Sequence, residues 1–222
     1  MEDLPVVQLF IVLLLLSAIA IIYMEARRRL LAQRRLIASI KADIAEETRM
    51  TAQVGVYAGA DQSTVVIGVS EEMGGFYYRV VRQHAEAGRG KINLCNITVV
   101  DLYIDGQVQE VHENGSQMPT STAQATELSG RLLSQYPPDQ VNAMQRIELR
   151  IGYLSESGSE HTLEFSALRP TVAPRRRDRT QILKNALWWC IFIRLAAQHT
   201  RLAAEGLYGL ADDENSFKKN SE

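Results

Sequence analysis

Hydrophobic residues follow one another from Val6 to Met24 without a charged residue among them. A helix over this run rises about 28 Å at 1.5 Å per residue, enough to cross the hydrocarbon core of a bilayer. The pattern therefore predicts a transmembrane helix over residues 6–24, after a flank over residues 1–5. A secretory signal peptide is the main alternative, because Ala18-Ile19-Ala20 fits a cleavage site, and a buried core helix is another. The acidic flank MEDLP and the apolar residues beyond that site favour an anchor that is not cleaved.

The helical pattern continues beyond the apolar run. Leu30, Ile37 and Ile44 recur every seven positions with Ile40 at a neighbouring site, and no Gly or Pro occurs before Met50. We expect a basic juxtamembrane stalk over residues 25–52. The heptads are too few for a sustained coiled coil, so the stalk either packs on its own domain, packs on a partner or self-associates.

The central part of the chain changes to a period of two, which is typical of strands. Residues 63–70 and 75–83 predict a hairpin around Gly74-Gly75, and residues 96–104 and 107–112 predict a second one across Asp105-Gly106. Residues 146–154 and 161–168 predict a third. Together they predict six strands in an antiparallel β domain over residues 53–170.

Alternation within these strands separates an apolar face from a polar one. Two sets are expected to point to the core: Val100, Leu102 and Ile104, and Ile147, Leu149, Ile151 and Tyr153. Glu148, Arg150 and Gly152 lie between the second set, so we expect the opposite face of that hairpin to be wet.

Helical signals interrupt and follow the strands. Residues 121–136 predict an inserted helix with Leu128, Leu132 and Leu133 on one side and a stop at Pro137-Pro138. A Pro/Arg linker over residues 171–179 precedes an apolar, amphipathic helix over residues 180–206. Residues 207–222 mix charges of both signs and are predicted to be a disordered tail.

The fold class is therefore α+β: a transmembrane helix and stalk, a small antiparallel sheet or partly open barrel with one inserted helix, and a C-terminal helix. This arrangement resembles in outline the pleckstrin-homology-like domains of membrane-anchored bacterial proteins. The resemblance is architectural, and no motif accompanies it that would assign functional residues.

Positive charges predict the orientation of the anchor. Lys and Arg beside a span stay on the cytoplasmic side, and five arginines follow the apolar run: Arg27, Arg28, Arg29, Arg34 and Arg35. We expect an inner-membrane protein with its N-terminus outside and its body in the cytoplasm. Topology alone explains these arginines, and contact with anionic lipid is an additional possibility.

Composition and motifs narrow the chemistry. The net charge of −2 does not favour a nucleic-acid binder. Cys95 and Cys190 are expected to be free thiols, which suits a reducing compartment. The four histidines lack metal-ligand spacing, and Gly88 to Lys91 lacks the context of a phosphate loop, so we interpret it as a turn. No catalytic residue, metal site or cofactor is predicted.

The C-terminal helix carries the strongest apolar signal after the anchor. Its expected docking surface consists of Leu187, Trp188, Trp189, Ile191, Phe192 and Leu195. A run of this length is too short to span a bilayer. The helix docks on the sheet, lies in the membrane interface or binds a partner, and the sequence leaves these three open.

An anchor, a globular body and no catalytic constellation predict an interaction or scaffolding protein, an accessory subunit of a larger membrane complex, rather than an enzyme. We expect the bilayer and a protein as partners, and the oligomeric state stays open. The alternative is a membrane-tethered enzyme or small-ligand sensor with a pocket at one end of the sheet. It rests on five polar residues of neighbouring predicted hairpins: Tyr77, Tyr78, Arg79, Asp101 and Asp105.

Overall fold

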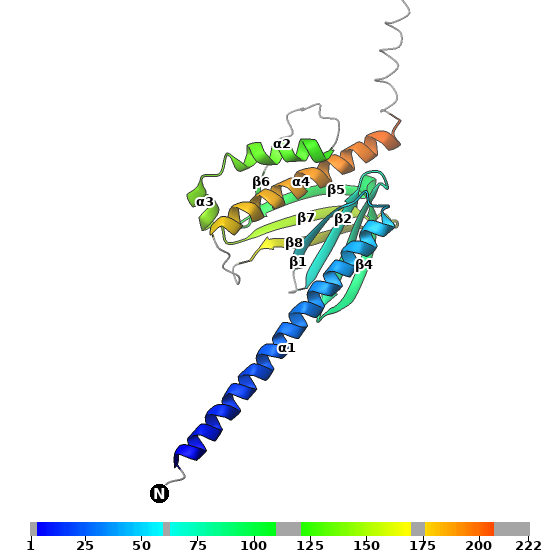
Figure 1. The fold of residues 1–222 in the computed structure, drawn as a ribbon. Helices are drawn as coiled ribbons and strands as arrows, with labels where there is room; N and C mark the ends of the chain where they lie inside the picture. Colours follow the sequence, from blue (N-terminus) through cyan, green and yellow to red (C-terminus); the bar gives the residue numbers. More distant parts are fainter. Residues whose placement is uncertain (1–3, 60–62, 110–120, 170–175, 207–222) are drawn as a thin grey trace, which may run out of the picture.

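A computed structural model describes residues 4–59, 63–109, 121–169 and 176–206 of the chain (Figure 1). A long N-terminal helix precedes eight strands, and three further helices follow the sixth strand. The elements are α1 (Leu4–Glu47), β1 (Gln53–Gly59), β2 (Thr64–Ser70), β3 (Gly75–Arg82), β4 (Ala85–Asn93), a 3-10 turn (Leu94–Asn96), β5 (Ile97–Ile104), β6 (Gln107–Gln109), α2 (Ser121–Leu133), α3 (Pro138–Ala143), β7 (Ile147–Leu154), β8 (Glu160–Leu168) and α4 (Arg176–Ala204).

The strands form one open antiparallel sheet in the order β4-β3-β2-β1-β8-β7-β5-β6. Its two halves, β4 to β1 and β8 to β6, meet only where Ala58 pairs with Ser166 and Gly59 with Phe165. Figure 1 shows the strands of the two halves running in different directions. The α+β class with an open antiparallel sheet is therefore confirmed.

Helix α4 covers one face of both halves and supplies much of the main core. The expected apolar faces of β5 and β7 point to it, and Val100, Leu102, Ile147, Leu149 and Ile151 are all buried. Helix α2 packs along α4, where the indole of Trp188 donates a hydrogen bond of 3.1 Å to Thr126. The inserted and terminal helices thus form a second layer over the sheet (Figure 1).

Helix α1 packs on the opposite face. In β2, Val65 and Ile67 belong to the core under α4, whereas Val66 between them belongs to a smaller core with Ile40 and Ile44 of α1. Side chains alternate between the faces of a strand, so the domain is a sheet between α4 on one side and the end of α1 on the other.

Two strands were not expected from the sequence. Strand β1 lies in a stretch rich in glycine and small residues, and β4 contains the segment from Gly88 to Lys91 that we interpreted as a turn. That interpretation is wrong because tertiary packing favours glycine there. Strand β4 pairs with β3, and a Cβ added at Gly90 would collide with the ring of Tyr78. A residue with weak strand propensity is retained because a neighbouring ring occupies its side-chain space.

The predicted turn at Asp105-Gly106 is confirmed. Both residues have positive φ angles, 50° and 85°, as a type I′ turn between β5 and β6 requires. The Asp105 carboxylate also accepts hydrogen bonds of 2.8 Å from the backbone N–H groups of Gln145 and Arg146. It therefore ties the hairpin to the start of β7.

Other expectations change in detail. Pro138 begins α3 rather than ending the inserted helix, because proline suits the first turn of a helix, where its missing N–H has no partner to lose.

Helix α4 begins at Arg176, inside the predicted linker, and the Arg179 guanidinium donates a hydrogen bond of 2.7 Å to the Met144 carbonyl just beyond α3. Glu148 is 5% exposed, so the outer face of β7 is not wet there. The predicted tail and residues 110–112 and 171–175 lie outside the described residues.

Because α4 forms the core, we expect Phe192→Ala to lower the free energy of unfolding by about 3–5 kcal/mol. Phe192 is 2% exposed and its ring lies 4.8 Å from that of Trp188. Chemical denaturation measures the change. Lys184→Ala on the exposed side of the same helix is the control, and equal effects of the two substitutions would contradict this account of the core.

Candidate functional site

The N-terminal part of α1 is a long apolar surface without a covering element. Every described side chain from residue 10 to residue 32 is exposed, including Phe10, Ile19 and Ile22 at more than 60%. Within the described part of the chain, α1 alone is long and apolar enough to cross a membrane. Such a surface is costly in water.

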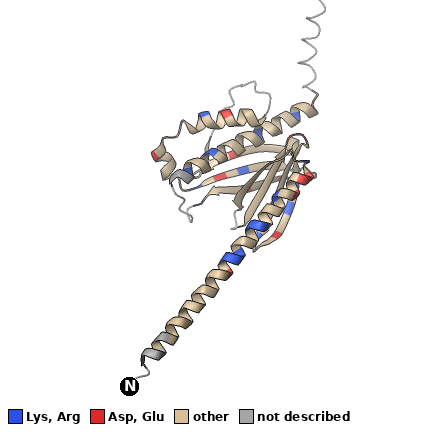
Figure 2. Cartoon of the chain, viewed as in Figure 1, with Lys and Arg blue, Asp and Glu red and all other residues tan. Residues whose placement is uncertain are grey.

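A band of arginines separates this surface from the domain. All five predicted membrane-flanking residues, Arg27, Arg28, Arg29, Arg34 and Arg35, are exposed on α1. Figure 2 shows their blue band between the bare apolar helix and the sheet. Arg29 pairs with Glu25 one turn earlier at 3.0 Å. Exposed ion pairs of this kind contribute little to stability, so the cationic band is available to other groups.

The last third of α1 is fixed on β2 and β3. Ile40 and Ile44 are 1% and 0% exposed and pack with Val66 and Tyr77, while the Gln33 amide donates a hydrogen bond of 3.2 Å to the Thr64 hydroxyl. Leu30 on the same stripe is 50% exposed, below the sheet. The stalk therefore packs on its own domain from Gln33 onward.

Gly68 of β2 provides the space for this helix. A Cβ built at Gly68 would lie 2.5 Å from Cγ2 of Ile44, closer than carbon atoms approach without a shift. The absence of a side chain at this one position lets α1 lie directly against the backbone of β2.

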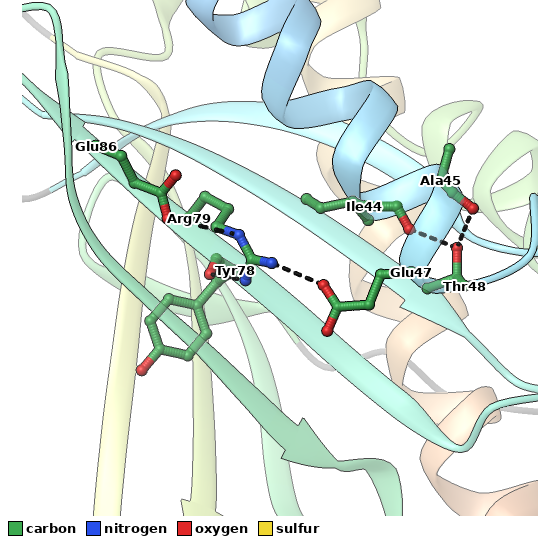
Figure 3. A network of polar contacts seen from close by, with 7 residues as sticks. All are labelled: Ile44, Ala45, Glu47, Thr48, Tyr78, Arg79 and Glu86. Atoms are coloured by element: carbon green, nitrogen blue, oxygen red, sulfur yellow. Dashed lines mark hydrogen bonds and ion pairs between the residues drawn. The ribbon is translucent and has the colours of Figure 1, made fainter.

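A buried arginine completes the joint (Figure 3). Arg79 of β3 is 8% exposed. Its guanidinium lies 2.7 Å from the Glu47 carboxylate of α1 and 3.6 Å from the Glu86 carboxylate of β4. Thr48, which is fully buried, donates its hydroxyl to the Ile44 carbonyl at 2.7 Å, and the same carbonyl accepts the Thr48 backbone N–H at 3.0 Å. The end of α1 is thus held by packing and by a charged pair.

One unbroken helix therefore connects the apolar surface to the sheet. From Arg27 to Leu36, whose side chain packs against the small core with Ile40 and Ile44, α1 rises about 14 Å. Described residues 4–47 contain no break in this helix. If the apolar part is fixed in a bilayer, the domain is held at a set distance from it and in a set orientation.

The expected docking surface of the C-terminal helix lies on the sheet of the same chain. Five of its residues are at most 7% exposed: Leu187, Trp189, Ile191, Phe192 and Leu195. The sixth, Trp188, is partly buried against the same core. Of the three possibilities that the sequence left open, α4 adopts the first and docks on the sheet.

The five polar residues of the alternative pocket do not meet. Tyr77, Tyr78 and Arg79 lie on β3 and Asp101 on β5, and β2, β1, β8 and β7 lie between these strands. Tyr77 and Tyr78 also point to opposite faces, so these residues do not form one site.

A serine, a histidine and a glutamate do meet where the start of α2, the last turns of α4 and the end of β2 come together. The Ser121 hydroxyl of α2 lies 2.8 Å from Nδ1 of His199 on α4 and also bonds to Glu71 after β2, whose carboxylate lies 3.5 Å from the same nitrogen. A catalytic relay places the hydroxyl and the acid on different ring nitrogens. Ser121 is also fully buried, so this cluster joins three elements rather than presenting a nucleophile.

The described residues show no cluster of metal-ligating side chains and hold both cysteines as free thiols. They contain no group of three or more His, Cys, Asp or Glu side chains that could hold a metal ion. Cys95 and Cys190 are both free thiols. No protein-family model, curated protein or solved structure matches the chain.

If Gly68 sets the approach of α1, Gly68→Ala is expected to displace Ile44 and loosen the joint. Backbone amides of residues 36–47 should then exchange hydrogen at least several-fold faster, because local opening of the helix becomes easier. Hydrogen exchange with mass spectrometry measures this. Gly88→Ala on β4, where an added Cβ has no neighbour within 4 Å, is the control. Unchanged exchange in the Gly68 variant would contradict the role of this glycine.

Proposed function

We propose that this protein is a single-pass inner-membrane protein whose cytoplasmic β domain is an interaction or scaffolding module, an accessory subunit of a larger membrane-associated complex. The observation that carries the proposal is the division of α1. Its first half is apolar and uncovered, its last third is fixed on the sheet, and five arginines lie between the two.

This division suits a protein that positions a binding surface relative to a bilayer. Burying the large apolar side chains of α1 in lipid removes them from water at about 1.5–3 kcal/mol each. The arginines then lie at the headgroups, where each gains about 1 kcal/mol on an anionic surface. The docked end gives the domain a fixed orientation, which a flexible linker does not provide.

The β domain is, in this proposal, pleckstrin-homology-like in outline. The two four-stranded halves and the C-terminal helix packed across them support the likeness in outline. The alternative function, a membrane-tethered enzyme or small-ligand sensor, has less support, because four strands separate the polar residues of β3 from Asp101 of β5 in the sheet order, and Tyr77 and Tyr78 point to opposite faces.

The arginine band predicts the orientation. A reporter that is active only outside the cytoplasm is expected to be silent when fused after Glu222, and protease added to sealed cells is expected to leave the β domain intact. Replacing the five arginines by neutral residues and adding lysines before Pro5 should weaken or invert this preference. Cleavage of the unmodified protein from outside would contradict the orientation.

A scaffolding role predicts a stable partner. Purification of the full chain in mild detergent, followed by native mass spectrometry, is expected to yield a complex larger than the single chain. A Gly68→Ala variant, in which the domain is no longer held rigidly, should recover less of that complex, while Gly88→Ala should recover as much as the original. Recovery of a solitary chain under all conditions would contradict the proposed function.

A further inference from the structure

The sheet has an internal edge where its two halves separate. Ala58 and Gly59 are the only residues of β1 paired with β8, so the preceding residues of β1 have a strand neighbour on one side only. Ala167 and Leu168 at the end of β8 run past them without pairing to β1, although Leu168 pairs with Ile147 of β7 on its other side. A cleft of about 390 Å³ lies here.

The backbone of β1 presents specific groups to this cleft. The N–H of Gly59 donates to the Ser63 carbonyl at 2.8 Å, on the side of β2. Hydrogen-bonding direction alternates along a strand, so Tyr57 and Gly55 also face β2, while Val54 and Val56 face the cleft. Two N–H groups and two carbonyls are therefore exposed on this edge without a strand partner among the described residues.

No described residue that lines the cleft is charged. Besides β1, its described walls are Ser166 and Ala167 of β8 and Ile182, Asn185 and Trp189 of α4. The ring of Trp189 lies so close to Gly55 that an added Cβ would come within 2.8 Å of it. Helix α4 thus contributes an aromatic and aliphatic floor below the open edge of β1.

One lining residue also has an unsatisfied polar group. Tyr57 is 8% exposed, and its hydroxyl has no hydrogen-bond partner among the described residues. Burial raises the pKa of this hydroxyl, and the nearby Cys190 thiol raises it further. The group is therefore a neutral donor within the core beside the cleft.

The other edges of the sheet are protected against pairing. Glu86, Arg89 and Lys91 are exposed along the outer strand β4, and charged side chains discourage the addition of another strand. On β5, beyond the short β6, the Arg194 guanidinium donates to the Val100 carbonyl at 2.6 Å and occupies the edge. Only the edge of β1 combines free backbone groups with neutral surroundings among these three.

We propose that this cleft binds an extended, uncharged segment of a partner protein, which pairs with β1 as an added strand through Val54 and Val56. The alternate side chains of that segment point to Trp189 and Ile182 below and to the outer face beside Val56, which is 40% exposed. The open edge from Val54 to Tyr57 accommodates about four residues at 3.3 Å each.

The chemistry of the walls favours a peptide over other occupants. A lipid acyl chain would cover the backbone groups of Val54 and Val56 without bonding to them, and leaving such groups unsatisfied is unfavourable. A second folded copy would have to insert a strand of its own sheet between β1 and β8. A single extended segment needs neither, since it bonds to β1 and places apolar side chains on Trp189.

This inference names the kind of partner in the proposed function and rests on it to that extent, but it is testable without a natural partner. The full chain in nanodiscs is mixed with a defined probe, the capped peptide acetyl-Thr-Val-Thr-Val-Thr-Val-Thr-amide. The expected result is slower hydrogen exchange at the amides of Val54 and Val56 and a shift in the fluorescence of Trp189. The same peptide with proline in place of its central valine should produce neither change when the peptide is present at about 1 mM.

Val56→Pro tests the pairing directly. It removes an N–H that faces the cleft and leaves the β1–β2 ladder its own bonds, so we expect peptide affinity to fall about tenfold or more. Val56→Ala keeps this N–H and should retain binding. If the proline variant does not fold, the exchange measurement on the unmodified protein still decides the matter.

Several outcomes would overturn the inference. One is that the peptide does not protect the amides of Val54 and Val56, and another is that the Val56→Pro protein binds the peptide as well as the unmodified protein does. Protection that rises with protein concentration alone would indicate a second copy instead. A response of Trp189 to lipid but not to peptide would also contradict the inference. Failure of the proposed function has a different signature, because it appears as a solitary chain on purification, whatever the peptide does in nanodiscs.

Discussion

The fixed attachment of α1 to the sheet is the constraint on which the rest of the architecture depends. An apolar helix can cross a bilayer whatever follows it, but it transmits position only if its far end is held. Here the space left by Gly68, the packing of Ile40 and Ile44, and the contact between Arg79 and Glu47 hold it together. Apolar packing supplies most of the free energy, and the buried guanidinium fixes where the last turn ends.

Helix α4 solves a different problem on the other face. The two halves of the sheet share only two residue pairs, so the ladder between them contributes little to their relative position. Residues of α4 from Leu183 to Ala197 pack on both halves and form one core with them. The segment that most resembled an interfacial helix in the sequence therefore holds the two halves of the domain together.

Because α4 joins the halves, the strands need not stay paired along their full length. The cleft between β1 and β8 can remain open without loss of the core, and Trp189 forms its floor while remaining 7% exposed. Charged residues cover β4, and Arg194 occupies the edge of β5. An unprotected edge is a liability in a soluble protein, which is a physical reason to assign it to a partner.

The sequence by itself determined the features that depend on neighbouring residues: the apolar length of the anchor segment, the arginines after it, the turn at Asp105-Gly106 and the inward faces of β5 and β7. These follow from local periodicity and from residues whose conformational preferences are strong. It missed β1 and β4, because their glycines are explained by the rings of Trp189 and Tyr78, which come from other elements. Only the tertiary structure decided that the stalk packs on β2, that α4 covers the sheet, that four strands separate β3 from β5 in the sheet order and that β1 diverges from β8. Each of these depends on contacts between residues distant in the chain, and a single sequence does not specify which apolar surfaces will meet.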